Sequence, residues 1–69
     1  MPVITIQAPK LSNEQKKELT ITLTNEAARI MNMPVAPFTV LIYENDLTNI
    51  GFGGKWLGDM NVANTMKIN

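Results

Sequence analysis

The feature that most constrains the fold is the order of segments: a short apolar stretch, a long amphipathic stretch and a second short apolar stretch. Residues 3–8 alternate in polarity. Ile4, Ile6 and Ala8 share one side, and this period of two predicts a strand with one apolar face. Residues 38–44 are mainly apolar on both sides. A strand of that kind needs both of its faces covered.

The segment between these strands predicts a single long helix over residues 12–32. Ser12 and Gln15 have the spacing of a capping box, in which each side chain binds the backbone N–H of the other. We expect the helix to end before Pro34, because a proline pushes the residue before it out of the helical region. Apolar residues at spacings of three and four form the stripe that we expect to be buried. They are Leu19, Leu23, Ala27, Ile30 and Met31.

A strand, a long helix and a second strand form a βαβ unit, whose right-handed crossover makes the strands parallel. The predicted fold class is therefore α/β, with one βαβ unit, a short glycine-rich hairpin over residues 50–56 and a tail over residues 60–69. We expect one domain over residues 1–69. One helix covers only one face of a two-stranded sheet, and such a sheet is marginal by itself. Self-association is expected, because a chain without cysteine has no disulfide to stabilise it.

Composition excludes several classes of function. Six Lys and Arg residues balance six Asp and Glu residues, so we expect neither nucleic acid nor a membrane surface as a partner. Histidine and cysteine are absent, which removes zinc sites, thiol nucleophiles and imidazole bases. We expect no metal and no cofactor. The lack of cysteine and of an apolar run of roughly 20 residues fits a cytoplasmic protein.

Pro2 is the main candidate for chemistry among the residue types that remain. Once Met1 is removed, the chain begins with a secondary amine, a base and a nucleophile, directly before an apolar strand. An α-amino group has an ordinary pKa near 8. Apolar surroundings favour its neutral form, which is the form that a general base requires. The other interpretation, that Met-Pro is an ordinary start without chemical meaning, stays open on these residues alone.

Four segments of the chain carry a family resemblance. They are M-P-V-I-T-I-Q at the start, then L-S-N-E-Q-K-K-E-L, P-F-T-V-L-I-Y-E and N-I-G-F-G-G-K. In this order, from Pro2 to about Lys55, they resemble the 4-oxalocrotonate tautomerase family of the tautomerase superfamily. The resemblance implies a βαβ chain that dimerises into a four-stranded sheet with two helices on one face. It also implies three such dimers in a hexamer.

The same resemblance implies a site. Pro2 falls on the catalytic amino-terminal proline of the family, the base that moves a proton between oxygen and carbon of an enol. Lys10 and Thr39 fall where the best-studied members have two substrate-binding arginines. Ile50 falls on an aromatic position, and Phe52 lies two residues further on. Lysine lacks the planar fork with which arginine holds a carboxylate, and threonine is neutral. We therefore expect a singly charged substrate rather than a dicarboxylate.

The expected function is that of an isomerase, a tautomerase that acts on a small enol or α-keto acid with Pro2 as general base. We expect it to work as a homo-oligomer, a hexamer or a dimer. The same amine can also hydrate or dehalogenate an unsaturated acid, or form an imine with an aldehyde. The alternative from another class is a family member that has lost catalysis and serves as an oligomeric scaffold or binding protein. A retained Met1 favours this alternative, because it turns the Pro2 nitrogen into an amide without basicity.

Overall fold

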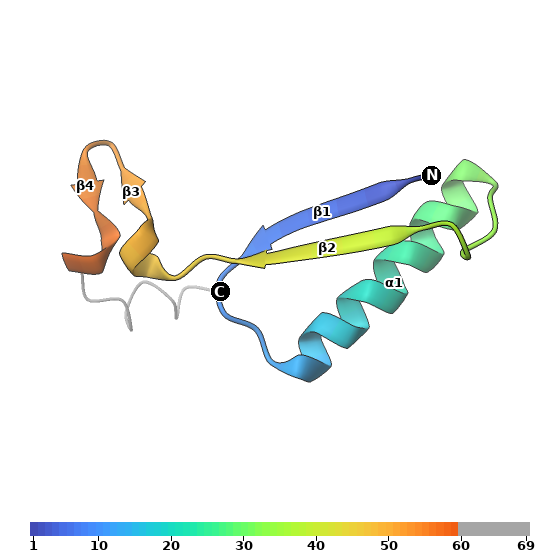
Figure 1. The fold of residues 1–69 in the computed structure, drawn as a ribbon, viewed down its shortest axis with the longest axis horizontal. Helices are drawn as coiled ribbons and strands as arrows, with labels where there is room; N and C mark the ends of the chain where they lie inside the picture. Colours follow the sequence, from blue (N-terminus) through green and yellow to red (C-terminus); the bar gives the residue numbers. More distant parts are fainter. Residues whose placement is uncertain (60–69) are drawn as a thin grey trace.

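A computed structural model of the chain describes residues 1–59, so the expected tail over residues 60–69 lies outside the described residues. The chain forms a βαβ unit followed by a small arm (Figure 1). In order, the elements are β1 (Val3–Ala8), α1 (Asn13–Met31), β2 (Thr39–Glu44), the 3-10 turn η1 (Leu47–Asn49), β3 (Gly51–Phe52), β4 (Lys55–Trp56) and the 3-10 turn η2 (Leu57–Asp59). The predicted α/β class is confirmed.

β1 and β2 pair in parallel over their full length. The register pairs Val3 with Thr39 at one end and Ala8 with Glu44 at the other. Along β1 the side chains alternate between exposed and half-buried. Ile4 and Ile6 lie on the half-buried side, as the period of two predicts. α1 covers this face, and none of the elements within residues 1–59 covers the opposite face of the two strands (Figure 1).

The capping box at the start of α1 is confirmed. The Gln15 N–H donates to Ser12 Oγ at 3.1 Å, and the Ser12 N–H donates to Gln15 Oε1 at 2.9 Å. At the other end Asn32 adopts the left-handed conformation, with φ 56° and ψ 50°. Its backbone N–H donates to the carbonyls of Ala28 and Arg29, which is a common way to end a helix. Ser12 and Asn32 are therefore caps, one residue outside each end of the helix proper.

The predicted apolar stripe of the helix is only partly covered. Leu19, Leu23 and Ala27 are half-buried, but Ile30 is 69% exposed and Met31 is 50% exposed. The buried residue of α1 is instead Ala28. Helical residues advance by about 100°, so Ile30 lies roughly 160° around the axis from Ala28 and points away from the sheet. Two strands about 4.8 Å apart are also too narrow to cover a wide stripe. The expectation that Ile30 and Met31 are buried within the chain is wrong.

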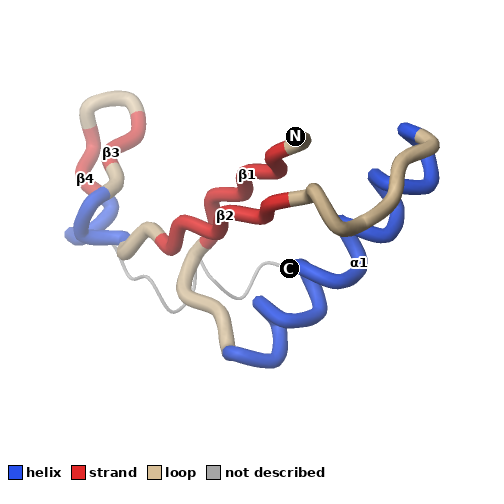
Figure 2. The backbone as a smooth tube through the Cα atoms, turned by 45° about the vertical axis from the view of Figure 1, so that its right-hand side comes forward, coloured by secondary structure: helices blue, strands red, loops and turns tan. Residues whose placement is uncertain are grey.

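The segment after β2 folds into an arm that extends away from the βαβ unit (Figure 1, Figure 2). β3 and β4 pair in antiparallel fashion around Gly53 and Gly54, whose φ angles of 60° and 80° suit glycine. Trp56 Nε1 donates to the Thr48 carbonyl at 2.7 Å and ties the hairpin to η1. The radius of gyration is 15.5 Å, against about 11 Å for a compact domain of this length. The chain is therefore elongated.

Residues 1–59 show neither a membrane-spanning helix nor an acidic cluster for a metal ion. Between residues 1 and 59, no helix combines the length and the apolar character that crossing a membrane requires. The same part of the chain has no group of three or more acidic side chains placed to hold a metal ion.

Candidate functional site

Pro2 lies at the amino-terminal end of the sheet, one residue before β1. Its side chain is half-buried, and its carbonyl accepts a hydrogen bond from the Thr39 N–H at 3.0 Å. This bond extends the ladder of β1 and β2 by one step beyond the Val3–Thr39 pair. The structure thus brings together two of the five predicted site residues, and backbone pairing fixes the position of the proline ring.

The other three predicted site residues lie beyond the opposite end of the sheet. Lys10 follows β1 and is exposed, whereas Ile50 and Phe52 follow β2. Five strand steps separate Val3 from Ala8, a distance of roughly 17 Å. Within one chain, Lys10 and Phe52 therefore do not reach Pro2. Figure 2 shows the amino terminus and the β3–β4 arm separated in the same way from a second direction.

A hollow of about 290 Å³ lies beside the carboxyl ends of the strands. Its lining consists of Gln7, Ala8, Pro9, Asn45, Leu47 and Ile50. The Asn45 side chain donates to Gln7 Oε1 at 2.9 Å, and the Asn45 N–H donates to the Ala8 carbonyl at 2.8 Å. Ligand pockets usually begin near 300 Å³. A hollow of this size fits a small carbon skeleton, and Ile50 provides part of its apolar wall.

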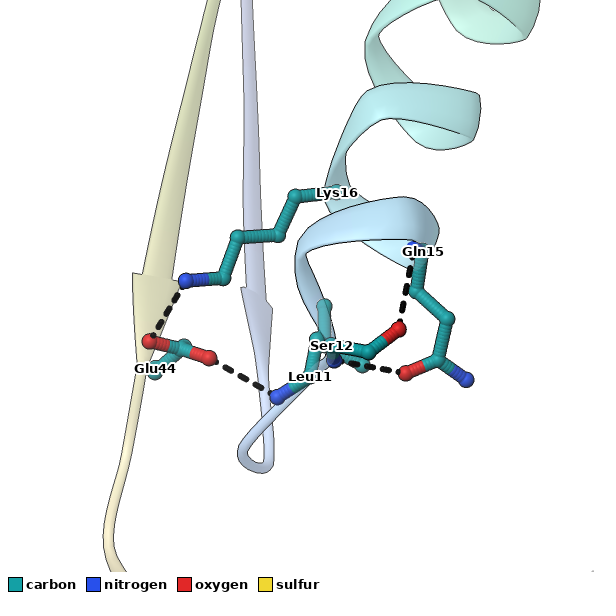
Figure 3. A network of polar contacts seen from close by, with 5 residues as sticks. All are labelled: Leu11, Ser12, Gln15, Lys16 and Glu44. Atoms are coloured by element: carbon teal, nitrogen blue, oxygen red, sulfur yellow. Dashed lines mark hydrogen bonds and ion pairs between the residues drawn. The ribbon is translucent and has the colours of Figure 1, made fainter.

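Two carboxylates lie near Lys10, at and just after the end of β2. Glu44 Oε2 accepts from the Leu11 N–H at 2.8 Å, and Glu44 Oε1 forms an ion pair with Lys16 Nζ at 3.2 Å (Figure 3). The Leu11 N–H, and then Lys16, lower the pKa of Glu44. Hydrogen bonds from the Thr48 hydroxyl and the Thr48 N–H lower the pKa of Asp46. Lys10 contributes a smaller attraction to both groups, so its charge lies near two ionised carboxylates.

Sequence reasoning does not identify the contacts of Glu44. The hydrogen bond from Leu11 joins residues 33 positions apart, and no local motif marks it. The signal that exists is the strand register: a residue opposite Ala8 at the end of β2 faces the turn that leaves β1.

A scan against protein families decides where this chain belongs. Residues 2–60 match the family model described as Tautomerase enzyme. The chain belongs to the tautomerase family. The resemblance seen in the four sequence segments is therefore confirmed, and the matched range begins at Pro2. Among curated proteins, none matches this tautomerase-family chain.

Solved structures agree with this assignment. DmpI from Archaeoglobus fulgidus is 40% identical, with 84% of this chain and 100% of that chain covered and a TM-score of 0.73. A 4-oxalocrotonate tautomerase homologue is 27% identical, with 88% and 98% covered and a TM-score of 0.80. A heterohexamer 4-oxalocrotonate tautomerase from Chloroflexus aurantiacus is 26% identical, with 88% and 98% covered and a TM-score of 0.72. The tautomerase-family protein thus shares the fold of these structures almost end to end.

Proposed function

We propose that this protein is a keto–enol isomerase in which the amine of Pro2, freed by removal of Met1, acts as general base. The observation that carries the proposal is the start of the family match at residue 2. Met1 precedes this match, lies outside β1 and is 92% exposed. Its removal would take away almost no packing and would leave Pro2 in its place beside Thr39.

The proposed reaction needs one group that accepts a proton and then returns it. The neutral nitrogen of Pro2 takes the proton from the enol hydroxyl. The electron pair of the O–H bond stays on the oxygen and forms the second bond of the new carbonyl. The electron pair of the carbon–carbon double bond then takes the proton from the proline ammonium. Atoms and charge balance, and no cofactor enters. An α-amino group with an ordinary pKa near 8 can serve both steps near neutral pH.

The proposed site requires more than one copy of the chain, because Lys10 and Phe52 lie far from Pro2 within a single copy. A compact monomer of 7.7 kDa exposes about 4,300 Å², whereas this chain exposes 5567 Å². The excess of roughly 1,200 Å² exceeds the 800 Å² or so that each partner gives to a standard interface. We propose a homo-oligomer built from dimers with four-stranded sheets, most simply a hexamer, and a cytoplasmic location.

The proposed substrate carries a single negative charge. Lys10 follows β1 at the position of one family arginine, and Thr39 beside Pro2 is neutral. A charge-assisted hydrogen bond contributes about 1.5–3 kcal/mol, so a neutral Thr39 at the position of the second family arginine disfavours a dicarboxylate. The nearby charges of Glu44 and Asp46 repel a second carboxylate further. A monocarboxylate enol such as phenylenolpyruvate fits this arrangement.

One observation favours the second candidate, a scaffold or binding protein without catalysis. Phe52, proposed as a substrate wall, is 78% exposed, and an exposed aromatic ring on an arm also suits a contact between subunits. In that case the chain keeps the family fold and Pro2 has no chemical role.

The ketonisation of phenylenolpyruvate tests the proposal, with 2-hydroxymuconate as the dicarboxylate comparison. We expect a higher kcat/KM for the monocarboxylate. The Pro2→Ala variant keeps a terminal amine but loses the ring that fixes its torsion, and misplacing a group by about 1 Å costs on the order of a hundredfold in rate.

Pro34→Ala in the exposed connector after α1 is the matched control and should retain wild-type turnover. Wild-type activity in Pro2→Ala would contradict the role of Pro2. A strong preference for the dicarboxylate would contradict the proposed substrate charge.

A further inference from the structure

We infer that Glu44 is a positioning residue: its carboxylate holds the turn that carries Lys10, so that the Lys10 ammonium meets the anionic group of the substrate. The inference rests on the proposed function for the role of Lys10 and adds a residue to it. Glu44 itself touches no reacting atom.

The geometry of the turn supports this role. The turn between β1 and α1 is short, and it is held at both sides of Lys10. On the β1 side, the Ala8 carbonyl accepts from the Asn45 N–H at 2.8 Å. On the α1 side, the Leu11 N–H donates to Glu44 Oε2 at 2.8 Å (Figure 3). Both anchors come from the end of β2, so the register of the sheet sets where the Lys10 backbone lies.

Lys16 completes the arrangement by holding the other oxygen of Glu44. The 3.2 Å ion pair from Lys16 Nζ to Oε1 turns Oε2 toward Leu11 (Figure 3). Within residues 1–59 the two ion pairs use Lys16 and Arg29. The ammonium of Lys10 is therefore not taken by a carboxylate in the described part of the chain, although Glu44 and Asp46 lie near it. Without Lys16, Glu44 is free to pair with Lys10 and to compete with the substrate.

Two substitutions at Glu44 separate its hydrogen bond from its charge. Glu44→Ala removes the acceptor for the Leu11 N–H and releases the turn. Glu44→Gln keeps a carbonyl oxygen that can accept the same hydrogen bond but removes the ion pair with Lys16. Glu26→Ala is the matched control, because Glu26 is an exposed carboxylate that pairs with Arg29 on the surface of α1.

The measurement is the steady-state ketonisation of phenylenolpyruvate, with kcat and KM determined separately. We expect Glu44→Ala to raise KM about five-fold, the factor for one ordinary hydrogen bond, and to leave kcat near the wild-type value. Glu44→Gln should have a KM close to that of wild type. Glu26→Ala should change neither kcat nor KM. An unchanged KM in Glu44→Ala overturns the inference. Equal impairment of Glu44→Gln and Glu44→Ala also overturns it, because charge rather than the hydrogen bond then acts.

A second readout separates this inference from the proposed function. Hydrogen exchange of the Leu11 amide and binding of 3-phenylpropanoate, a carboxylate that cannot tautomerise, need no turnover. If the wild-type chain is inactive, the proposed function fails, and these two measurements still decide about Glu44. We expect Glu44→Ala to speed Leu11 exchange and to weaken 3-phenylpropanoate binding, with Glu44→Gln close to wild type. Faster exchange with unchanged binding would overturn the inference.

Discussion

At the scale of single residues, Glu44 connects three parts of the chain. It ends β2, accepts the N–H of Leu11 from the turn after β1, and pairs with Lys16 in the first turns of α1. The ionised form makes these contacts best, since a carboxylate is the stronger acceptor and the partner of Lys16. The network therefore joins β2, the turn after β1 and α1 at one residue.

The contribution of Glu44 to stability should depend on pH. The Leu11 N–H and Lys16 lower its pKa from the ordinary value of 4.5. A group whose pKa is lowered by folding contributes its full stabilisation at a pH above its pKa in the unfolded protein. It loses this contribution as the pH falls through its pKa in the folded protein. We expect the difference in free energy of unfolding between wild type and Glu44→Gln to be largest at neutral pH. It should shrink below pH 4.5. Urea unfolding at a series of pH values measures it, and a difference that stays constant with pH would contradict the expectation.

At the scale of elements, local sequence signals predict most of the fold. The alternation in β1, the Ser12–Gln15 capping box and the paired glycines of the hairpin act over a few residues, so the sequence reveals them directly. Burial along α1 does not follow from such signals. The apolar spacing that includes Ile30 predicts one buried stripe, but the rotation of the helix over a narrow sheet places Ala28 at the contact. The apolar pattern of the sequence does not distinguish a residue that the chain's own sheet covers from one that stays exposed, as Ile30 does.

The β3–β4 arm should depend on a close contact between Gly58 and Trp56. A Cβ atom at Gly58 would clash with the indole ring of Trp56, so Gly58→Ala should displace the indole from its hydrogen bond to the Thr48 carbonyl. Overpacking lowers the free energy of unfolding by about 1 kcal/mol in its mildest cases. We expect this mild effect here, because the ring is half exposed and can move. We expect lower stability and a shifted tryptophan fluorescence.

Gly51→Ala is the matched control within the same arm. A Cβ atom there meets the Lys55 carbonyl at 3.6 Å, an ordinary contact. Gly51→Ala should therefore keep the fluorescence of wild type. A Gly58→Ala variant whose tryptophan spectrum equals that of wild type would show that the indole does not pack as described.

At the scale of the whole molecule, the described residues leave several large apolar side chains exposed. Leu41 and Tyr43 of β2 are 41% and 49% exposed on the uncovered face of the sheet. The arm extends away from the βαβ unit (Figure 1). The sequence predicts this exposed sheet face, because one helix cannot cover both faces of a sheet. It does not predict whether Pro2 and Lys10 meet, because they lie at opposite ends of the sheet within one chain and a meeting would depend on the arrangement of copies rather than on any local pattern.

The assembly should be visible in sedimentation. We expect analytical ultracentrifugation at micromolar concentration to show an oligomer, with the mass of a hexamer as the specific expectation. Leu41→Glu places a charge on the uncovered sheet face and should lower the mass, because burying an unpaired charge is costly. Asn25→Glu adds the same charge at an exposed helix position and should not. A folded monomer of the wild-type chain would contradict the proposed assembly.

The state of the Pro2 nitrogen is the centre of the proposed function, and one comparison tests it most directly. The chain is prepared in two forms: one with Met1 removed, and one with an uncleaved residue in front of Pro2, each verified by intact mass. The second form has an amide at Pro2 and no basic nitrogen there, while β1, β2 and α1 form with Met1 in place. We predict that the processed form ketonises phenylenolpyruvate and that the extended form has lost nearly all of this activity. Equal turnover by the two forms would contradict the role of Pro2 as the base.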